Sequence, residues 1–377
     1  MKKTIIALAT AAVFATSANA ATVYEQDGTK VEIGGSVRVL LSKEKGKRTD
    51  LKNNDSRLEV NASHDLGNGL SALGGVEIRF DGDDTDESAG KFGNPTTNKL
   101  FAGLGYEGVG TLTFGKQATN GDDVQLNDNS YVWGGNNNLL DSADKSIKFR
   151  SAEWSGFSFG LDYVFGNAEK KNLPVEEGTL DDKYSYQASV FYTRELAQDL
   201  TLNLAGGYGM NYEDFNTTKS YSKSRDWRTG FQLAYGPVTF GAEYGETLEK
   251  PEDVKLSKDR KLLVAASYQV MEPSKIYVQW KRDQNKYLTD VEYQVHPTDP
   301  NLRVQKDAGS KVTTNTFVVG ADYKLHKHVV TYIEYAYAKT KDQASSRHTT
   351  DGNTWVDSSY TNTTKDNKIG VGLRVFF

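Results

Sequence analysis

The sequence contains few residues whose types and spacing suit catalysis or metal binding. It has 377 residues and no Cys, which excludes disulfide frameworks, Cys-ligated zinc and thiol nucleophiles. The segment 103–108, Gly-Leu-Gly-Tyr-Glu-Gly, fits the spacing of a dinucleotide-binding loop, but it lies between two strand-like segments and lacks the helix that would hold a phosphate. His326 and His328 flank Lys327 without a third ligand nearby. We therefore expect no catalytic residues, no metal, no cofactor and no enzymatic activity.

The other reactive side chains are charged ones, which are numerous and of both signs. Lys and Arg number 45, and Asp and Glu number 50, so the formal net charge is −5. A nucleic-acid binder would carry a positive excess, and we expect no nucleic-acid partner. Many of these charges alternate with apolar residues along the chain, and this alternation indicates the secondary structure that carries them.

The alternation has a period of two, which is typical of strands. In segment 70–80 the even positions are apolar or small, whereas the odd positions include Ser71, Glu77 and Arg79. The same pattern recurs in further segments, at 31–41, 57–62, 157–163, 227–235, 275–281, 316–323 and 370–377. No segment shows a helical period.

Short and long connections alternate between these segments. The short ones carry turn residues, as at Asp65-Leu66-Gly67-Asn68-Gly69 and Gly236-Pro237. We expect long polar loops between them, at about 82–97, 117–141, 166–182, 213–224, 245–260, 283–310 and 341–365. The count of alternating segments predicts about 16 strands, with the short turns at one end of the fold and the long loops at the other.

Two architectures would produce this alternation, a two-sheet sandwich and a closed barrel. A sandwich of so many strands would have to split into domains, yet no linker or change of composition divides the chain. Aromatic residues also gather at strand ends, which is typical of a membrane interface. We therefore predict an all-β fold, a single transmembrane antiparallel β-barrel over residues 21–377, with apolar residues facing lipid and polar residues lining the interior.

The N-terminal residues 1–20 are predicted to be a cleaved signal peptide. Met1-Lys2-Lys3 provides a positive start, residues 4–15 an apolar stretch, and Ala18-Asn19-Ala20 a small-x-small cleavage pattern. The cleavage site lies between Ala20 and Ala21. The chain is thus expected to be exported, and no later segment is apolar enough to anchor it as a helix.

Several segments carry a family resemblance, namely residues 28–35, 54–58, 101–106 and 114–116, Trp133-Gly134-Gly135 in the third long loop, residues 323–327 with 331–334, and residues 371–377. On these segments the sequence resembles the general porins of Gram-negative outer membranes over its whole mature length. Residues 323–327 with 331–334 and residues 371–377 are closest to the major porins of pasteurella-like bacteria. The terminal Phe377, which ends an alternating strand, looks like the assembly signal that the barrel-assembly machinery reads.

The resemblance implies a homotrimer of 16-stranded barrels in the outer membrane, in contact with lipid and lipopolysaccharide. Each barrel would hold a water-filled pore, narrowed by the third long loop, with acidic residues on the loop opposite basic residues on the wall. Aligned on Gly134-Gly135, Asp128 matches a loop acid, whereas Val132 stands where a second acid is expected. Arg57 matches a wall arginine. Four further inward basic residues complete the predicted pore constriction, Arg38, Arg79, Lys148 and Arg150.

The predicted function is passive diffusion of small hydrophilic solutes and ions through the lumen, selected by width and charge. Eight basic side chains on the assigned strands point inward, Arg38, Arg57, Arg79, Lys148, Arg150, Arg228, Lys281 and Arg374. Six acidic ones do the same, Glu59, Glu77, Asp162, Glu243, Asp322 and Glu334. This near balance predicts weak ion selectivity. A substrate-specific channel and a non-channel structural or adhesin barrel are the alternatives.

Overall fold

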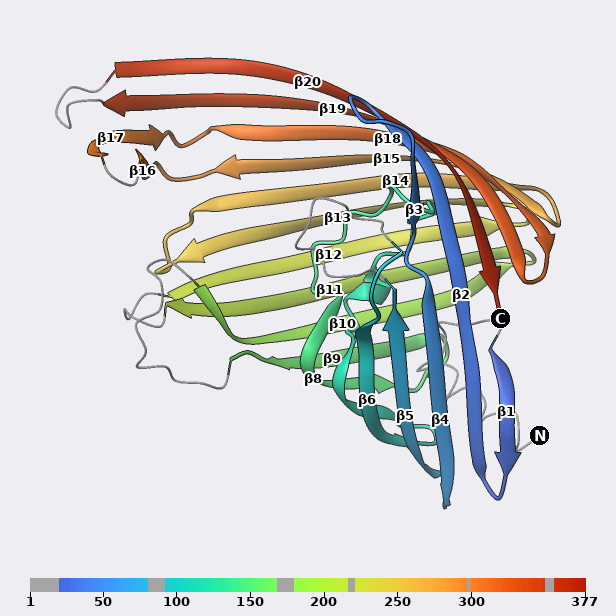
Figure 1. The fold of residues 1–377 in the computed structure, drawn as a ribbon. Coiled ribbons are helices and arrows are strands. Elements are labelled where there is room, and N and C mark those ends of the chain that lie inside the picture. The colour runs from blue at the N-terminus through green and yellow to red at the C-terminus, as the bar shows by residue number, and fades with distance from the viewer. Residues whose placement is uncertain (1–19, 81–91, 168–179, 216–220, 297–298, 350–355) are drawn as a thin grey trace.

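The computed structural model describes residues 20–80, 92–167, 180–215, 221–296, 299–349 and 356–377 (Figure 1). The predicted signal peptide, apart from Ala20, lies outside these residues. None of the helical structure in the described ranges could serve as a transmembrane span. The helical structure there is one short 3₁₀ turn, Asp122–Val124, and the fold is built from antiparallel strands.

A ring of 16 antiparallel strands forms the wall of a closed barrel, as the alternation predicted. Its first half consists of β2 (Thr29–Glu44), β4 (Arg57–Gly67), β5 (Leu70–Arg79), β6 (Thr96–Tyr106), β7 (Gly110–Ala118), β8 (Ser142–Ser151), β9 (Phe157–Phe165) and β10 (Leu180–Ala197). Its second half consists of β11 (Leu200–Phe215), β12 (Tyr221–Tyr235), β13 (Val238–Pro251), β14 (Ser257–Met271), β15 (Ser274–Tyr287), β18 (Lys311–His326), β19 (Val329–Thr349) and β20 (Val356–Phe376). Four short strands supplement the wall, β1 (Ala21–Gln26), β3 (Asp50–Asn53), β16 (Val291–His296) and β17 (Asp299–Lys306).

The barrel closes where β20 pairs with β2. The ladder runs from Ser36 opposite Phe376 to Glu44 opposite Lys368. The strand β1 continues along the same edge of β2, with Ala21 opposite Ile33. Each of the 16 wall strands has a partner on both sides, so none of these strands presents an open edge toward lipid, as a membrane requires.

Tight turns occupy one end of the barrel and longer connections the other. In the turns, residues with positive φ reverse the chain, for example Asn68 at 52° and Gly69 at 80° between β4 and β5. At the opposite end, the sequence-based boundaries of four loops are wrong. Most of the residues expected as loops at 213–224, 245–260, 283–310 and 341–365 belong to strands, namely β11 to β17, β19 and β20.

These strands run on because backbone pairing continues where the apolar pattern stops. Asp342, for example, still lies opposite Asn362 in the β19–β20 ladder. Outside the membrane both faces of a hairpin meet water, so neither face needs apolar residues, whereas the ladder hydrogen bonds persist. Loops predicted from polarity alone are therefore too long.

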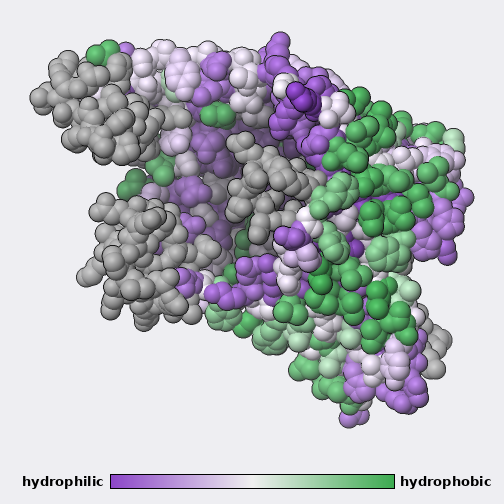
Figure 2. Space-filling model, viewed as in Figure 1, coloured by the Kyte–Doolittle hydropathy of each residue, from purple (hydrophilic) through white to green (hydrophobic). Residues whose placement is uncertain are grey.

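The polarity of the barrel is the reverse of that of a water-soluble fold. Val37, Leu161 and Phe317 are each about half exposed on the outside, whereas Glu77, Arg228 and Glu334 are buried inside. Figure 2 shows apolar residues over the outer face of the wall and hydrophilic residues in the hollow of the barrel. Exposed aromatic side chains follow the end with the tight turns, at Tyr106, Trp154, Tyr235, Tyr268 and Tyr323. Such a belt suits a membrane interface.

Candidate constriction of the barrel lumen

The connection between β7 and β8, residues 119–141, folds into the barrel and is called the inner loop below (Figure 1). Its residues form hydrogen bonds with side chains on β9, β12, β13, β15, β18, β19 and β20. Most of these contacts join a loop backbone group to a charged or amide side chain of the wall. Charged and amide side chains of the wall therefore hold the loop inside the barrel.

The first attachment lies at the start of the inner loop. The backbone N–H of Asn120 donates to both carboxylate oxygens of Asp162 at 3.1 Å, and its side-chain amide donates to Oδ1 at 3.0 Å. Lys148 Nζ donates to the carbonyl of Ala118 at 2.9 Å. Arg150 pairs with Asp123 of the loop at 3.1 Å. The predicted constriction residue Arg150 thus fastens the start of the loop, while Lys148 binds the last residue of β7, directly before it.

The second attachment uses an ion pair between β12 and β13. Arg228 Nε donates to Glu243 Oε2 at 2.9 Å, and both side chains are fully buried. The remaining hydrogen-bonding groups of the pair reach the loop. Glu243 accepts from the amide of Asn127 at 2.9 Å, and Arg228 donates to the carbonyl of Asn136 at 3.1 Å. Because both charges have several partners, their loss of hydration is compensated.

The third attachment holds the tip of the loop. Glu334 of β19 accepts the backbone N–H groups of Tyr131 and Trp133, each at 2.8 Å, and the hydroxyl of Tyr277 at 2.7 Å. The Tyr131 ring stacks on Tyr332 with centroids 4.3 Å apart. Arg374 donates to the carbonyl of Tyr131 at 2.9 Å. The tip is thereby fixed beside β19 and β20.

The segment Trp133-Gly134-Gly135 requires both of its glycines. A Cβ on Gly134 would collide with Ser130, Asp128 and Gln279. Gly135 has a φ of +67°, a conformation that side-chain-bearing residues rarely adopt. Lys281 of β15 donates to the carbonyls of both glycines, at 3.3 and 2.9 Å.

Asp128, the predicted loop acid, lies against β15. Its Oδ1 accepts from Gln279 Nε2 at 3.0 Å and from the backbone N–H of Ser130 at 3.0 Å. The carboxylate remains exposed on its other side. Asp128 is thus a charge of the inner loop, held in place by the wall.

The opposite wall carries a cluster of basic side chains on β2, β4, β5 and β6, called the basic cluster below. It consists of Arg38, Arg57, Arg79 and Lys99. The structure brings the first three together around one carboxylate, that of Asp55, which forms ion pairs with all of them. Glu77 lies beneath them and pairs with Lys99 at 2.8 Å and with Arg79 at 2.7 Å.

Sequence reasoning missed Lys99 and Asp55. Alternation in β6 would have placed Lys99 inward, because Leu100 and Leu104 are exposed outward. A register shift between β5 and β6 also brings Asn98 of β6 next to Glu77. Its side-chain amide donates a hydrogen bond to the Glu77 carboxylate at 2.6 Å. Asp55 lies in the link between β3 and β4, where no periodicity assigns a direction.

The six inward acids that the sequence predicts are all buried, at 6% exposure or less. Four of them, Asp162, Glu243, Asp322 and Glu334, accept hydrogen bonds from the inner loop. Of the eight inward basic residues, only Arg228 is buried to that extent. The acids therefore point inward as predicted, but they are covered, and a count of inward charges does not describe the surface that a solute meets.

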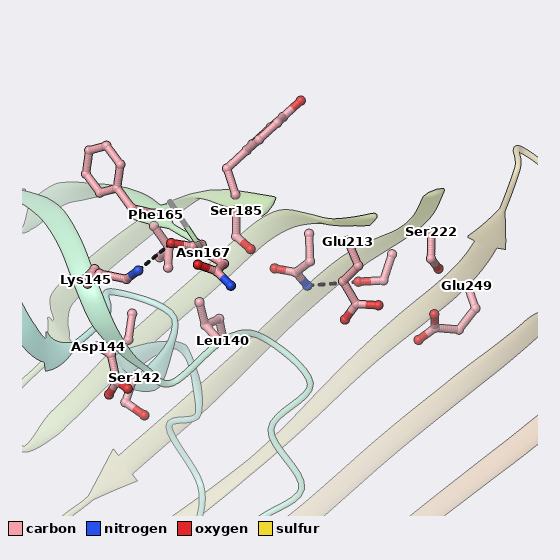
Figure 3. Close-up of a pocket in the computed structure, with 16 residues that line it drawn as sticks. Leu140, Ser142, Asp144, Lys145, Phe165, Asn167, Ser185, Glu213, Ser222 and Glu249 are labelled. Atoms are coloured by element: carbon pink, nitrogen blue, oxygen red, sulfur yellow. Dashed lines mark hydrogen bonds between the residues drawn. The ribbon is translucent and has the colours of Figure 1, made fainter. Parts of the chain in front are cut away.

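A polar cavity of about 600 Å³ lies beyond the last residues of the inner loop (Figure 3). Residues of β8 to β13 line it, including Lys145, Glu213 and Glu249. Among the described residues, no group of three His, Cys, Asp or Glu could hold a metal ion.

Three comparisons place the chain among known proteins. Residues 7–343 match a family model described as Gram-negative porin. A "Major outer membrane protein" of Pasteurella multocida is 39% identical over 391 residues, which cover 100% of both chains. OmpT of Vibrio cholerae, folded in vitro, is similar in structure with a TM-score of 0.66 at 20% identity, over 95% of this chain and 100% of that one. Its trimer form has a TM-score of 0.64 at 19% identity, over 93% of this chain and 100% of that one.

Proposed function

Because the chain belongs to the Gram-negative porin family, it is an outer-membrane porin, and we propose that small hydrophilic solutes and ions diffuse passively through its lumen. The observation that carries this proposal is the closed barrel with reversed polarity. Its outer face is apolar and its inner face polar. A polar, hydrated interior replaces the hydrocarbon layer for a solute, so that transport needs no chemical step and no energy source.

The inner loop narrows this lumen. Support comes from its attachments, which extend from Asp162 on β9 to Arg374 on β20. The loop therefore covers the wall from β9 to β20, whereas the basic cluster lies on β2 to β6. Solutes pass between the two surfaces, with Asp128 on the loop side and Arg38, Arg57 and Arg79 on the wall side. Opposed charges keep this passage hydrated and hinder apolar solutes.

The assembly is a homotrimer, each barrel with its own pore, and it has no enzymatic activity. The trimer form of the structurally similar OmpT supports this stoichiometry. The apolar outer face would contact membrane lipid, lipopolysaccharide and neighbouring barrels. Phe377 at the end of β20 is the residue that the barrel-assembly machinery would recognise during biogenesis.

Conductance across a planar lipid bilayer tests the proposed pore. Purified native protein is expected to insert in steps of fixed size, with current proportional to voltage, and the same sample after heat denaturation is the control. Proteoliposome swelling should then be fast for small sugars and slow for large ones. Silent bilayers despite a correctly folded barrel would contradict the proposal and favour a non-channel barrel. Swelling by one class of sugar alone would favour a substrate-specific channel.

A further inference from the structure

Asp55 lies at the meeting point of three arginines from three strands. Its Oδ1 forms an ion pair with Arg79 at 3.1 Å, and its Oδ2 with Arg38 at 3.4 Å and with Arg57. Planar guanidinium groups match the geometry of carboxylates and phosphates. The three arginines therefore already bind a carboxylate, and this carboxylate belongs to the protein itself.

Among the three acids Asp55, Glu59 and Glu77 that pair with the basic cluster, Asp55 is the most exposed to the lumen. Its side chain is 33% exposed, compared with 1% for Glu77 and 5% for Glu59. Those two acids lie beneath the bases and pair with Lys99. A passing ion thus meets the arginines and the Asp55 carboxylate, while Glu59 and Glu77 are covered.

The backbone holds this carboxylate in place. Asp55 has a φ of 71°, in the left-handed region that Asp and Asn tolerate better than most residues. On one side of it, Asn54 donates its backbone N–H to Arg38 O at 2.9 Å. On the other side, Ser56 donates its backbone N–H to Asn53 Oδ1 at 3.1 Å. The carboxylate is positioned before any solute arrives.

We propose that Asp55 is a specificity-determining residue of the pore. The arginines Arg38, Arg57 and Arg79 form a subsite for small anions such as phosphate and carboxylates, and Asp55 occupies it from within. The internal carboxylate lowers the preference of the pore for anions and leaves selectivity weak. The inference rests on the proposed function, because only an open pore has ion selectivity.

The test compares Asp55→Asn with Asp27→Asn in single-channel recordings. Asp27 is a matched control, since it has a φ of 52° and lies exposed in the turn between β1 and β2. Asn tolerates the left-handed conformation, so both variants keep the backbone and lose only a charge. In a potassium chloride gradient, Asp55→Asn should raise the chloride-to-potassium permeability ratio about threefold or more, the factor that one unit charge about 7 Å from an ion gives in water. Asp27→Asn should leave the ratio unchanged.

Inorganic phosphate tests the subsite directly. Added to one chamber, phosphate should interrupt the chloride current of Asp55→Asn at lower concentration than that of the native protein, because the three guanidinium groups then no longer pair with the Asp55 carboxylate. Equal sensitivity in the two proteins would overturn the assignment of the subsite. An equal permeability ratio in Asp55→Asn and Asp27→Asn would overturn the role of Asp55 in selectivity.

Two further measurements keep the outcome unambiguous. Gel mobility of unboiled samples reports whether each variant has folded. Should Asp55→Asn not fold, Arg79→Gln carries the test. This variant removes one base facing Asp55 and should lower the chloride-to-potassium permeability ratio. An unchanged ratio in Arg79→Gln would count against the inference. Native protein that folds without conducting would instead refute the proposed function.

Discussion

Arg228 of β12 and Glu243 of β13 form an ion pair that is fully buried between the barrel wall and the inner loop. Each residue also has a hydrogen-bond partner in the inner loop, because Arg228 donates to the carbonyl of Asn136 and Glu243 accepts from the amide of Asn127. One pair of opposite charges therefore joins two wall strands to two positions of the loop. The position of the loop is thus coupled to the integrity of the wall.

Removing one partner of this pair should be costly. Arg228→Met leaves the Glu243 charge buried without its counter-ion, and we expect a loss of about 3–5 kcal/mol in the free energy of unfolding. The double variant Arg228→Met, Glu243→Met removes both charges and should recover part of that loss. Urea titration, followed by gel mobility, measures the free energy of unfolding of both variants. A single variant as stable as the native protein would contradict the role given to the pair.

Loosening the tip of the inner loop should change the current rather than the fold. Glu334→Gln retains one acceptor oxygen but replaces the other with an amide, which cannot accept the N–H groups of both Tyr131 and Trp133. We expect an intact barrel whose single-channel current is noisier and whose mean conductance differs from the native value. Glu272→Gln, in an exposed turn, is the control. Quiet native-like channels from Glu334→Gln would show that the other attachments suffice.

The two glycines after Trp133 should be intolerant of a side chain. In Gly134→Ala the new methyl group meets Asp128, Ser130 and Gln279, so the loop must move. We expect altered conductance with little loss of barrel stability. Gly206→Ala is the matched control, because a Cβ on Gly206 would lie 3.7 Å from the nearest atom. Unaltered conductance in Gly134→Ala would mean that the loop absorbs the methyl group locally.

Closure of the barrel should depend on Gly35. Its backbone exchanges hydrogen bonds with Phe377 at 3.0 and 3.1 Å. A Cβ there would lie 2.5 Å from the carbonyl of Arg57 and 2.8 Å from the Phe377 ring. Gly35→Ala should lower the yield of folded barrel, measured by gel mobility after refolding. Gly74→Ala, where the nearest atom is at 3.6 Å, should refold normally; equal yields would refute the prediction.

Much of the architecture could be predicted because it follows from the local sequence. Alternation such as that around Glu77 and Arg79 assigned each side chain to a face, and the turn residues located the tight end of the barrel. The loop boundaries were less accurate. Outside the membrane, residues such as Asp342 pair within a ladder without any apolar alternation.

The grouping of the site residues could not be predicted in the same way. Lys148 and Arg150 pointed inward as expected, but they lie with the start of the inner loop rather than with Arg57. The acid that draws Arg38, Arg57 and Arg79 together comes from a link with no periodicity. The sequence order of these residues contains no information on which of them meet.

The barrel, its reversed polarity and the inward direction of the charged residues follow from the sequence, because they depend on period-two alternation along each strand. Which charges the lumen exposes depends instead on the folded barrel. Glu243 and Glu334 lie under the inner loop and Asp55 lies among three arginines because strands distant in sequence curve around one interior. Exposure and ion pairing are properties of that shared interior, and no single strand encodes them.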